Sequence, residues 1–171
     1  MKKYIKNLLV FVCICTVMTV FLATTNHLTA PIIEKNQIAS TNKSLKEVMP
    51  KGENFEKLDI TKLSLSSSIT EVYKETNGKG YVIKIVTAGY GNDMIIMCGV
   101  NMEDVVTGAV CISSNETLGK EKTYGENFIN KNSKDINDVD TIAGATKTTK
   151  AYKNAVNDAL KCVKLLKGEA K

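Results

Sequence analysis

The sequence predicts an α+β protein in which helices flank an antiparallel β-sheet and one transmembrane helix precedes this domain. Near the N-terminus, residues 8–23 contain no charged side chain. In the middle of the chain, four short apolar runs are separated by turn residues, the pattern of consecutive antiparallel strands. Towards the C-terminus, apolar residues recur three and four positions apart over residues 151–166, which predicts an amphipathic helix.

The uncharged N-terminal run predicts a membrane anchor. With the two threonines that follow it, the run has about the length that crosses a bilayer. Lysines precede it, so the positive-inside rule predicts a cytoplasmic N-terminus and an extracytoplasmic C-terminal part. A cleaved signal peptide is the alternative, but Leu28 and Pro31 around the nearest small-residue site at Ala30 disfavour cleavage. We therefore expect a single-pass, uncleaved anchor in a bacterial cell membrane.

The chain is expected to have three parts. Residues 1–27 are the cytoplasmic tip and anchor, residues 28–52 are a helical connector, and residues 53–171 are the extracytoplasmic domain. Pro31 could begin the connector helix, and Pro50 with Gly52 would end it.

The extracytoplasmic domain is expected to begin with a polar loop that contains one short strand. Four longer strands should follow, and the Asn77-Gly78 pair after the first of them is a hairpin signal. The predicted strands are residues 69–74, 81–87, 94–100 and 105–113.

The charge pattern argues against nucleic-acid binding. The formal net charge is +5, and all 23 basic residues are lysine, whereas base-reading proteins depend on arginine. The lysines alternate with acidic residues, as on a solvated surface. We expect the lipid bilayer, and no nucleic acid, among the partners.

The cysteines do not form a metal-binding pattern. There are five, with no CxxC pair and only one histidine, so no metal site is expected. Cys98 and Cys111 fall on adjacent predicted strands, where they could form a disulfide or, like Cys162, be small buried apolar side chains. Cys13 and Cys15 lie in the anchor, where they face lipid or contact the redox centre of a partner.

The most informative segment is residues 140–149, DTIAGATKTT, which leads into the C-terminal helix. Gly144 permits turn geometry and the close approach of a bulky group, and Thr146 offers a hydroxyl for a phosphoester. The N–H groups at a helix N-terminus favour a phosphate, and Lys147 adds positive charge. The structural alternative is a turn that caps an amphipathic helix.

A second candidate segment is residues 115–119, NETLG, just after the last predicted strand. Glu116 and Thr117 have side chains that can form hydrogen bonds, and Leu118-Gly119 forms a tight turn beside them. The structural alternative is a polar loop in which the Glu-Thr pair occurs by chance.

Together these segments resemble the FMN-binding domain family. Residues 140–146 resemble its Asp-x-x-Ser/Thr-Gly-Ala-Thr signature, with Ala143 where the family usually has Ser or Thr. The resemblance implies FMN held by a phosphoester to Thr146, and a flavin transferase that recognises Asp140. The residues implied to bind the cofactor around Thr146 are Gly144, Ala145, Lys147, Thr148 and Thr149.

The Glu116 segment resembles the Glu-Thr-Pro-Gly-Leu-Gly loop that lies against the flavin ring in this family, shortened by the Pro-Gly pair. The resemblance implies that Glu116 and Thr117 hydrogen-bond the edge of the ring and that Leu118-Gly119 lies close to it. Further matches are the Gly89-Tyr90-Gly91 turn and residues 99–110. The order of anchor, connector, sheet, Glu-Thr loop, threonine and helix is similar to the G subunits of Rnf ion-translocating ferredoxin:NAD oxidoreductases. The C subunits of sodium-translocating NADH:quinone reductases are relatives.

This resemblance implies an electron-transfer subunit without catalytic acid or base residues, because the cofactor carries the chemistry. Its implied partners are the membrane, iron–sulfur and flavin subunits of an Rnf-type complex. Two alternatives are a free-standing extracytoplasmic FMN carrier and a membrane-anchored assembly module without cofactor.

Overall fold

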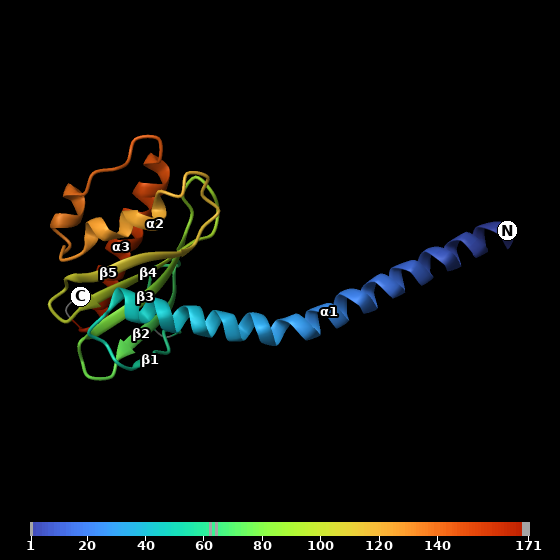
Figure 1. Cartoon of the computed structure of the whole chain (residues 1–171), viewed down its shortest axis with the longest axis horizontal. Helices are drawn as coiled ribbons and strands as arrows, with labels where there is room; N and C mark the ends of the chain where they lie inside the picture. Colours follow the sequence, from blue (N-terminus) through green and yellow to red (C-terminus); the bar gives the residue numbers. More distant parts are fainter. Residues whose placement is uncertain (1, 62, 64, 169–171) are drawn as a thin grey trace. The chain divides into compact units, whose positions relative to one another are not determined.

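A computed structural model of the chain describes residues 2–61, 63 and 65–168, with the side chains of residues 2, 3 and 32–39 left out (Figure 1). The chain divides into two units, Met1–Thr41 and Asn42–Lys171. The second unit contains a five-stranded antiparallel sheet with helices, so the predicted α+β class is confirmed. The predicted boundaries at residues 27 and 52 stay predictions.

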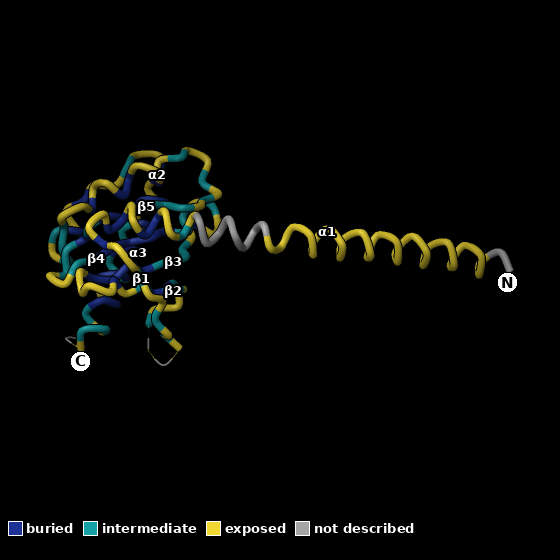
Figure 2. The backbone as a smooth tube through the Cα atoms, turned by 60° about the horizontal axis from the view of Figure 1, so that its bottom comes forward, coloured by how far each residue is buried: buried dark blue, intermediate teal, exposed yellow. Residues whose placement is uncertain are grey.

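The first helix, α1 (Lys2–Val48), contains the predicted anchor. Its segment Tyr4–Pro31 is long and apolar enough to cross a membrane, and its described side chains are exposed (Figure 2). Hydroxyl groups in this segment donate to carbonyls four residues earlier, as with Thr16 to Val12 at 2.8 Å. Such bonds pair the threonine hydroxyls within the helix, which suits a helix surrounded by lipid.

Pro31 lies inside α1 and does not begin a separate connector helix, contrary to expectation. A proline inside a helix has no N–H to donate to the carbonyl four residues earlier, here that of His27, and its ring crowds that carbonyl. The turns on both sides continue the same helix across the expected boundary.

The sheet follows the chain order β1-β2-β3-β4-β5 (Figure 1). In the second strand, buried residues are interspersed with exposed polar ones. The third and fourth strands are almost continuously apolar, because both of their faces are covered. The strands predicted from the turn residues are present within one or two residues, and the short early strand is β1. The bounds are β1 (Phe55–Lys57), β2 (Ile69–Glu75), β3 (Gly80–Thr87), β4 (Met94–Asn101) and β5 (Val106–Ser113).

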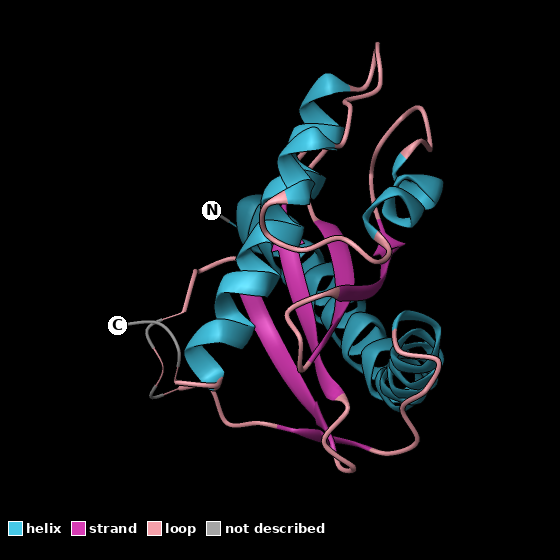
Figure 3. Ribbon diagram, turned by 90° about the vertical axis from the view of Figure 1, so that its left-hand side faces the viewer, coloured by secondary structure: helices cyan, strands magenta, loops and turns pink. Residues whose placement is uncertain are grey.

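One face of the sheet is covered by α3 (Thr146–Leu166), which carries the predicted C-terminal helix (Figure 3). The apolar stripe of α3, including Val156 and Leu160, is fully buried against β3 and β4. Between β5 and α3 the chain forms α2 (Glu121–Tyr124) and the short 3-10 helices η1 (Gly125–Phe128) and η2 (Asp135–Asp138). Tyr124, Phe128 and Tyr152 join these segments, with ring centroids 5.3 to 5.7 Å apart.

The other face of the sheet holds the C-terminal end of α1. Leu45, Val48 and Met49 are buried there against Val82 and Met97. The hydroxyl of Thr107 donates to the carbonyl of Val48 at 2.6 Å.

Two glycines that face each other on neighbouring strands make this close approach possible. Gly99 lies opposite Gly108 in the pairing of β4 with β5. A Cβ on Gly99 would lie 2.5 Å from the carbonyl oxygen of Val48, and one on Gly108 would lie 2.8 Å from its Cα. Both glycines are therefore needed for the end of α1 to pack on the sheet.

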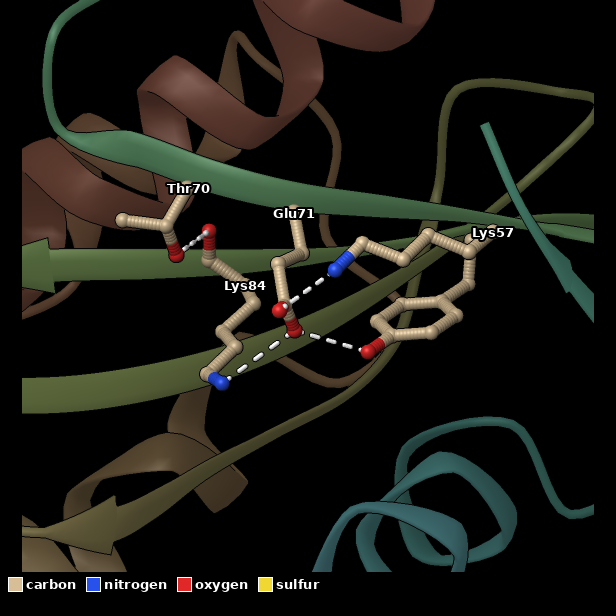
Figure 4. Close-up of polar contacts among 5 residues, drawn as sticks. Lys57, Thr70, Glu71 and Lys84 are labelled. Carbon is tan, nitrogen blue, oxygen red and sulfur yellow. Dashed lines mark hydrogen bonds and ion pairs between the residues drawn. The ribbon is translucent and has the colours of Figure 1, made fainter. Parts of the chain in front are cut away.

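A group of charged residues, which we call the Glu71 cluster, lies on β1, β2 and β3 (Figure 4). Glu71 accepts from Lys57 at 2.7 Å, from the hydroxyl of Tyr73 at 2.7 Å and from Lys84 at 3.2 Å. Burial would raise the pKa of Glu71, but the bonds from Lys57, Tyr73 and Lys84 lower it to about 2. The carboxylate is thus held charged by its partners.

All five cysteines are free thiols in the structure. Cys98 lies opposite Ala109, and Cys111 lies opposite Ile96, so the two thiols are offset along the strands. Cys98 and Cys162 are buried as small apolar side chains, one of the two expected alternatives. Burial raises the pKa of Cys98 to about 12 and that of Cys162 to about 11, so neither thiol is reactive near neutral pH.

Candidate functional site

A cleft of about 470 Å³ lies between the loop after β5 and the start of α3. It brings together the two segments that the sequence analysis singled out, although about 30 residues separate them. The cleft is lined by Tyr90, Glu116, Thr117, Leu118, Lys120, Glu121, Gly144, Ala145, Thr146, Lys147 and Thr148.

The start of α3 forms one wall of the cleft. Thr146 is the first residue of the helix and its side chain is exposed. Gly144 has φ +81°, which a residue with a side chain adopts only with strain, and the space beside it is open. Ala145 at the N-cap position has no side-chain cap, so the first N–H groups of α3 are available to an anion.

Glu116 joins three segments around the cleft, and we call this arrangement the Glu116 bridge. Its Oε1 accepts from the backbone N–H of Gly91 at 3.0 Å, and its Oε2 accepts from the hydroxyl of Thr148. A Cβ on Gly89 would lie 2.5 Å from Oε1 of Glu116 and 2.9 Å from Cα of Thr148. The 89–91 turn, the loop after β5 and α3 are therefore held together by one carboxylate.

This finding changes what is expected of Glu116. Both of its oxygens are engaged within the protein, so its role in the structure is to hold the walls of the cleft in place. A direct bond from Glu116 to the edge of a flavin stays a prediction.

Two exposed apolar side chains stand at the cleft. Tyr90 is 72% exposed on the 89–91 turn, and Leu118 is 59% exposed on the loop after β5. Exposed groups of this size suit contact with the face of a planar aromatic ligand. In the sequence Tyr90 is one residue of a turn that resembles the family's, and an aromatic residue between two glycines is the available signal.

Glu121 is a further cleft residue that the sequence analysis did not identify. Its side chain is only 1% exposed. Oε1 accepts from the hydroxyl of Ser114 at 2.6 Å, whereas Oε2 has no hydrogen-bond partner among the described residues. In the sequence it is one acid within a Lys-Glu-Lys run, and nothing there distinguishes it from a solvated surface residue.

Three residues predicted for the site lie outside the cleft lining. Gly119, with φ +63°, lies between the lining residues Leu118 and Lys120. The hydroxyl of Thr149 is buried and donates to the carbonyl of Ala145 at 3.0 Å. Thr149 therefore supports the first turn of α3 from within.

Asp140, the third of these, lies in a separate cleft of about 380 Å³. Its side chain is exposed, and its backbone carbonyl accepts from the hydroxyl of Tyr124 at 2.9 Å. This bond fixes the approach of the chain to Gly144. The other residues lining this second cleft are Tyr124, Asn127, Lys131, Asp138, Val139, Thr141 and Ile142.

The residues of the first cleft fit a cofactor with a phosphate at one end and a planar ring at the other. The uncapped N-terminus of α3 and Lys147 suit the phosphate, and Tyr90 and Leu118 suit the ring. In the part of the chain that the structure describes, no three His, Cys, Asp or Glu side chains come together as metal ligands.

Comparison with known proteins agrees with this interpretation of the cleft. The model of the FMN-binding domain family matches residues 89–161, a range that contains every residue lining the cleft. The chain is also similar to the G subunit of the Na(+)-translocating ferredoxin:NAD(+) oxidoreductase complex of Acetobacterium woodii. The two are 30% identical over 180 residues, which cover 88% of this chain and 86% of that relative.

Proposed function

The chain belongs to the FMN-binding domain family, and on this premise we propose that it is a membrane-anchored flavoprotein subunit of an Rnf-type complex. In that role it relays electrons between other subunits of an ion-translocating ferredoxin:NAD oxidoreductase. The observation that carries the proposal is the meeting of the Glu116 loop and the exposed Thr146 hydroxyl in one cleft.

FMN, when bound, supplies the electron-transfer chemistry, and the protein provides attachment and surroundings. Thr146 is the attachment point, through a phosphoester at its hydroxyl. The N–H groups of the first turn of α3 and Lys147 hold the phosphate, while Gly144 and Ala145 leave room for it. Tyr90, Thr117 and Leu118 would contact the ring. Glu116 holds the 89–91 turn and the start of α3 against the loop after β5.

Maturation requires a flavin transferase that recognises Asp140. The exposure of the Asp140 side chain, six residues before Thr146, supports access of such an enzyme. Covalent attachment keeps the cofactor on a domain that lies outside the cytoplasm, where lost FMN is not easily replaced.

The anchor places this domain at the outer side of the cell membrane, with the N-terminus in the cytoplasm. An impermeant maleimide added to intact cells should label Ser67→Cys, at an exposed loop position. The unsubstituted chain is the control. Labelling of Ser67→Cys only after lysis would contradict this orientation.

The central experiment is expression of the full chain together with a flavin transferase, beside Thr146→Ala. The unsubstituted chain should give a fluorescent band on a denaturing gel and one FMN-sized increment in intact mass, and Thr146→Ala should give neither. Thr123→Ala, at an exposed position outside the cleft, is the matched control and should be labelled fully. A colourless unsubstituted chain, or a labelled Thr146→Ala variant, would overturn the proposal.

A further inference from the structure

The start of α3 carries three threonine hydroxyls, and they differ in how they are bonded. The hydroxyl of Thr148 donates to Oε2 of Glu116, and that of Thr149 donates to the carbonyl of Ala145 at 3.0 Å. Thr146 is exposed, and its hydroxyl has no hydrogen-bond partner among the described residues. The hydroxyl that the proposed function uses is therefore the one that remains open to a reaction.

The first turn of α3 lacks the side-chain cap that usually holds a helix N-terminus. Ala145 at the N-cap position forms no such bond. An uncapped first turn opens readily, because its N–H groups have no partners within the helix. Opening would move Thr146, the first residue of the helix, together with its hydroxyl. A phosphoester forms quickly only while that hydroxyl keeps a fixed direction, because the reacting atoms must be aligned.

The Glu116 bridge holds this first turn from outside the helix. Thr148 lies two residues after Thr146, and its side chain is only 3% exposed. At the other end of the bridge, Oε1 of Glu116 accepts from the backbone N–H of Gly91 at 3.0 Å. A Cβ on Gly89 would lie 2.9 Å from Cα of Thr148, so these two backbone segments are already in close contact. The bridge thus takes the place of the missing cap and leaves the hydroxyl of Thr146 open.

We propose that Thr148 is a positioning residue for flavin attachment, because its bond to Glu116 fixes the turn that presents Thr146. The inference rests on the proposed function, since it needs Thr146 to be the attachment point. The co-reactant is a flavin adenine dinucleotide. Oγ1 of Thr146 forms a bond to the phosphorus of its FMN half, and the bond from that phosphorus to the bridging oxygen breaks. AMP leaves with this oxygen, and the hydroxyl proton passes to solvent.

The test measures the rate of flavin attachment to the full chain in detergent, with a flavin transferase and flavin adenine dinucleotide. Thr148→Val keeps the shape of the side chain but removes its hydroxyl. Its kcat should fall about tenfold, the factor expected when a hydrogen bond to a charged group is lost. KM for the chain should stay constant, because Asp140, the residue proposed for recognition, lies exposed in a separate cleft. An unchanged kcat would overturn the inference.

Rescue by a conservative variant separates positioning from packing. Thr148→Ser loses a buried methyl group but keeps the hydroxyl, so it should restore most of the kcat that Thr148→Val loses. Both variants disturb packing, and only the valine variant lacks the bond to Glu116. A serine variant as slow as the valine variant would show a merely structural role and overturn the inference.

The matched control is Thr149→Val, at the neighbouring buried threonine. In the part of the chain that the structure describes, the hydroxyl of Thr149 donates only to the carbonyls of Ala145 and Thr146. The backbone N–H of Thr149 still donates to the carbonyl of Ala145 at 2.9 Å, so the turn keeps this bond in the variant. The fall in kcat should therefore be smaller than in Thr148→Val, and equal falls would overturn the inference.

A second measurement needs no transferase. Amide hydrogen exchange of the unmodified full chain reports the opening of the first turn of α3. In Thr148→Val, residues 147–150 should exchange faster, whereas residues 155–163 should exchange as in the unsubstituted chain. Equal exchange at residues 147–150, or faster exchange along the whole helix, would overturn the role of Thr148 and leave the proposed function intact. Absence of attached flavin in the unsubstituted chain would overturn both.

Discussion

The Glu71 cluster and the cleft use carboxylates in opposite ways. In the Glu71 cluster both carboxylate oxygens accept from lysine ammonium groups, and a tyrosine hydroxyl adds a third bond. In the cleft, Glu116 accepts only from neutral donors, and one oxygen of Glu121 has no partner among the described residues. Charge pairing is complete where three strands are held together, and incomplete where a ligand is expected.

The number and charge of the hydrogen-bond donors therefore distinguish the carboxylate that holds three strands together from the carboxylates that line the cleft. The fully paired carboxylate of Glu71 keeps its charge over a wide pH range, because its partners lower its pKa to about 2. The lysines of the cleft stay exposed and do not neutralise its acids, which leaves them available to a phosphate.

Removing the Glu116 bridge should have the largest effect. Glu116→Ala leaves the N–H of Gly91 and the hydroxyl of Thr148 without their acceptor. Because hydrogen bonds to a charged group contribute about 1.5–3 kcal/mol each, we expect the free energy of unfolding to fall by about 3 kcal/mol. Denaturant unfolding followed by tyrosine fluorescence measures it. A loss below about 1 kcal/mol would contradict a bridging role for Glu116.

Crowding the same bridge should have the next largest effect. Gly89→Ala places a methyl group against Oε1 of Glu116 and the backbone of Thr148, so about 2 kcal/mol of stability should be lost. In the Glu116→Ala background part of this loss should disappear, because the Glu116 carboxylate is then absent. Strictly additive losses in the double variant would contradict the close contact.

The pH dependence of stability should come in part from the Glu71 cluster. The bonds to Glu71 lower its pKa from 4.5 to about 2, so below pH 4.5 the unfolded chain takes up a proton that the folded chain resists. Its stabilisation is complete above pH 4.5 and is lost as the pH falls towards 2. Thermal unfolding temperatures should fall less steeply in Glu71→Gln over this range; an unchanged slope would refute the assignment.

The smallest effect should come from the outer member of the cluster. The side chain of Lys57 is 57% exposed, so Lys57→Ala should cost about 0.5 kcal/mol or less, as for other exposed ion pairs. Lys84, which is more buried and directly opposite Glu71, should cost more when changed to alanine. Repeating both measurements in high salt should reduce the effect of Lys57→Ala proportionally more; equal sensitivity would argue against this ranking.

The strands could be predicted from sequence because their signals are local. Apolar runs between turn residues such as Asn77-Gly78 specify where strands begin and end, and the predicted bounds agree within two residues. The prediction that a helix begins at Pro31 was wrong, and the reason is also local. Proline is compatible with a helix start. It can also occur inside a helix, as in α1, where one backbone hydrogen bond is missing and helical turns continue on both sides.

The site could be predicted only where a residue carries its own signal. Gly144 and Thr146 belong to a recognisable segment, and the structure places them in the cleft. Glu121 carries no such signal, because its burial depends on how distant segments pack. Tyr90 lies between two glycines, but its exposure likewise depends on the packing of distant segments. Thr149 is the converse: it lies in the recognised segment, but the helical turn directs its hydroxyl back to Ala145.

The glycines opposite the end of α1 have a practical consequence for making the domain without its anchor. A fragment that begins at residue 42 keeps Leu45 and Val48, which pack on this face of the sheet, with the backbone of Val48 against the glycine pair. A fragment that begins at residue 53 would expose Val82 and Met97, which are fully buried in the whole chain. Exposed apolar faces of this kind cause aggregation. The last turns of α1 therefore help to keep the domain soluble, because they cover this apolar face.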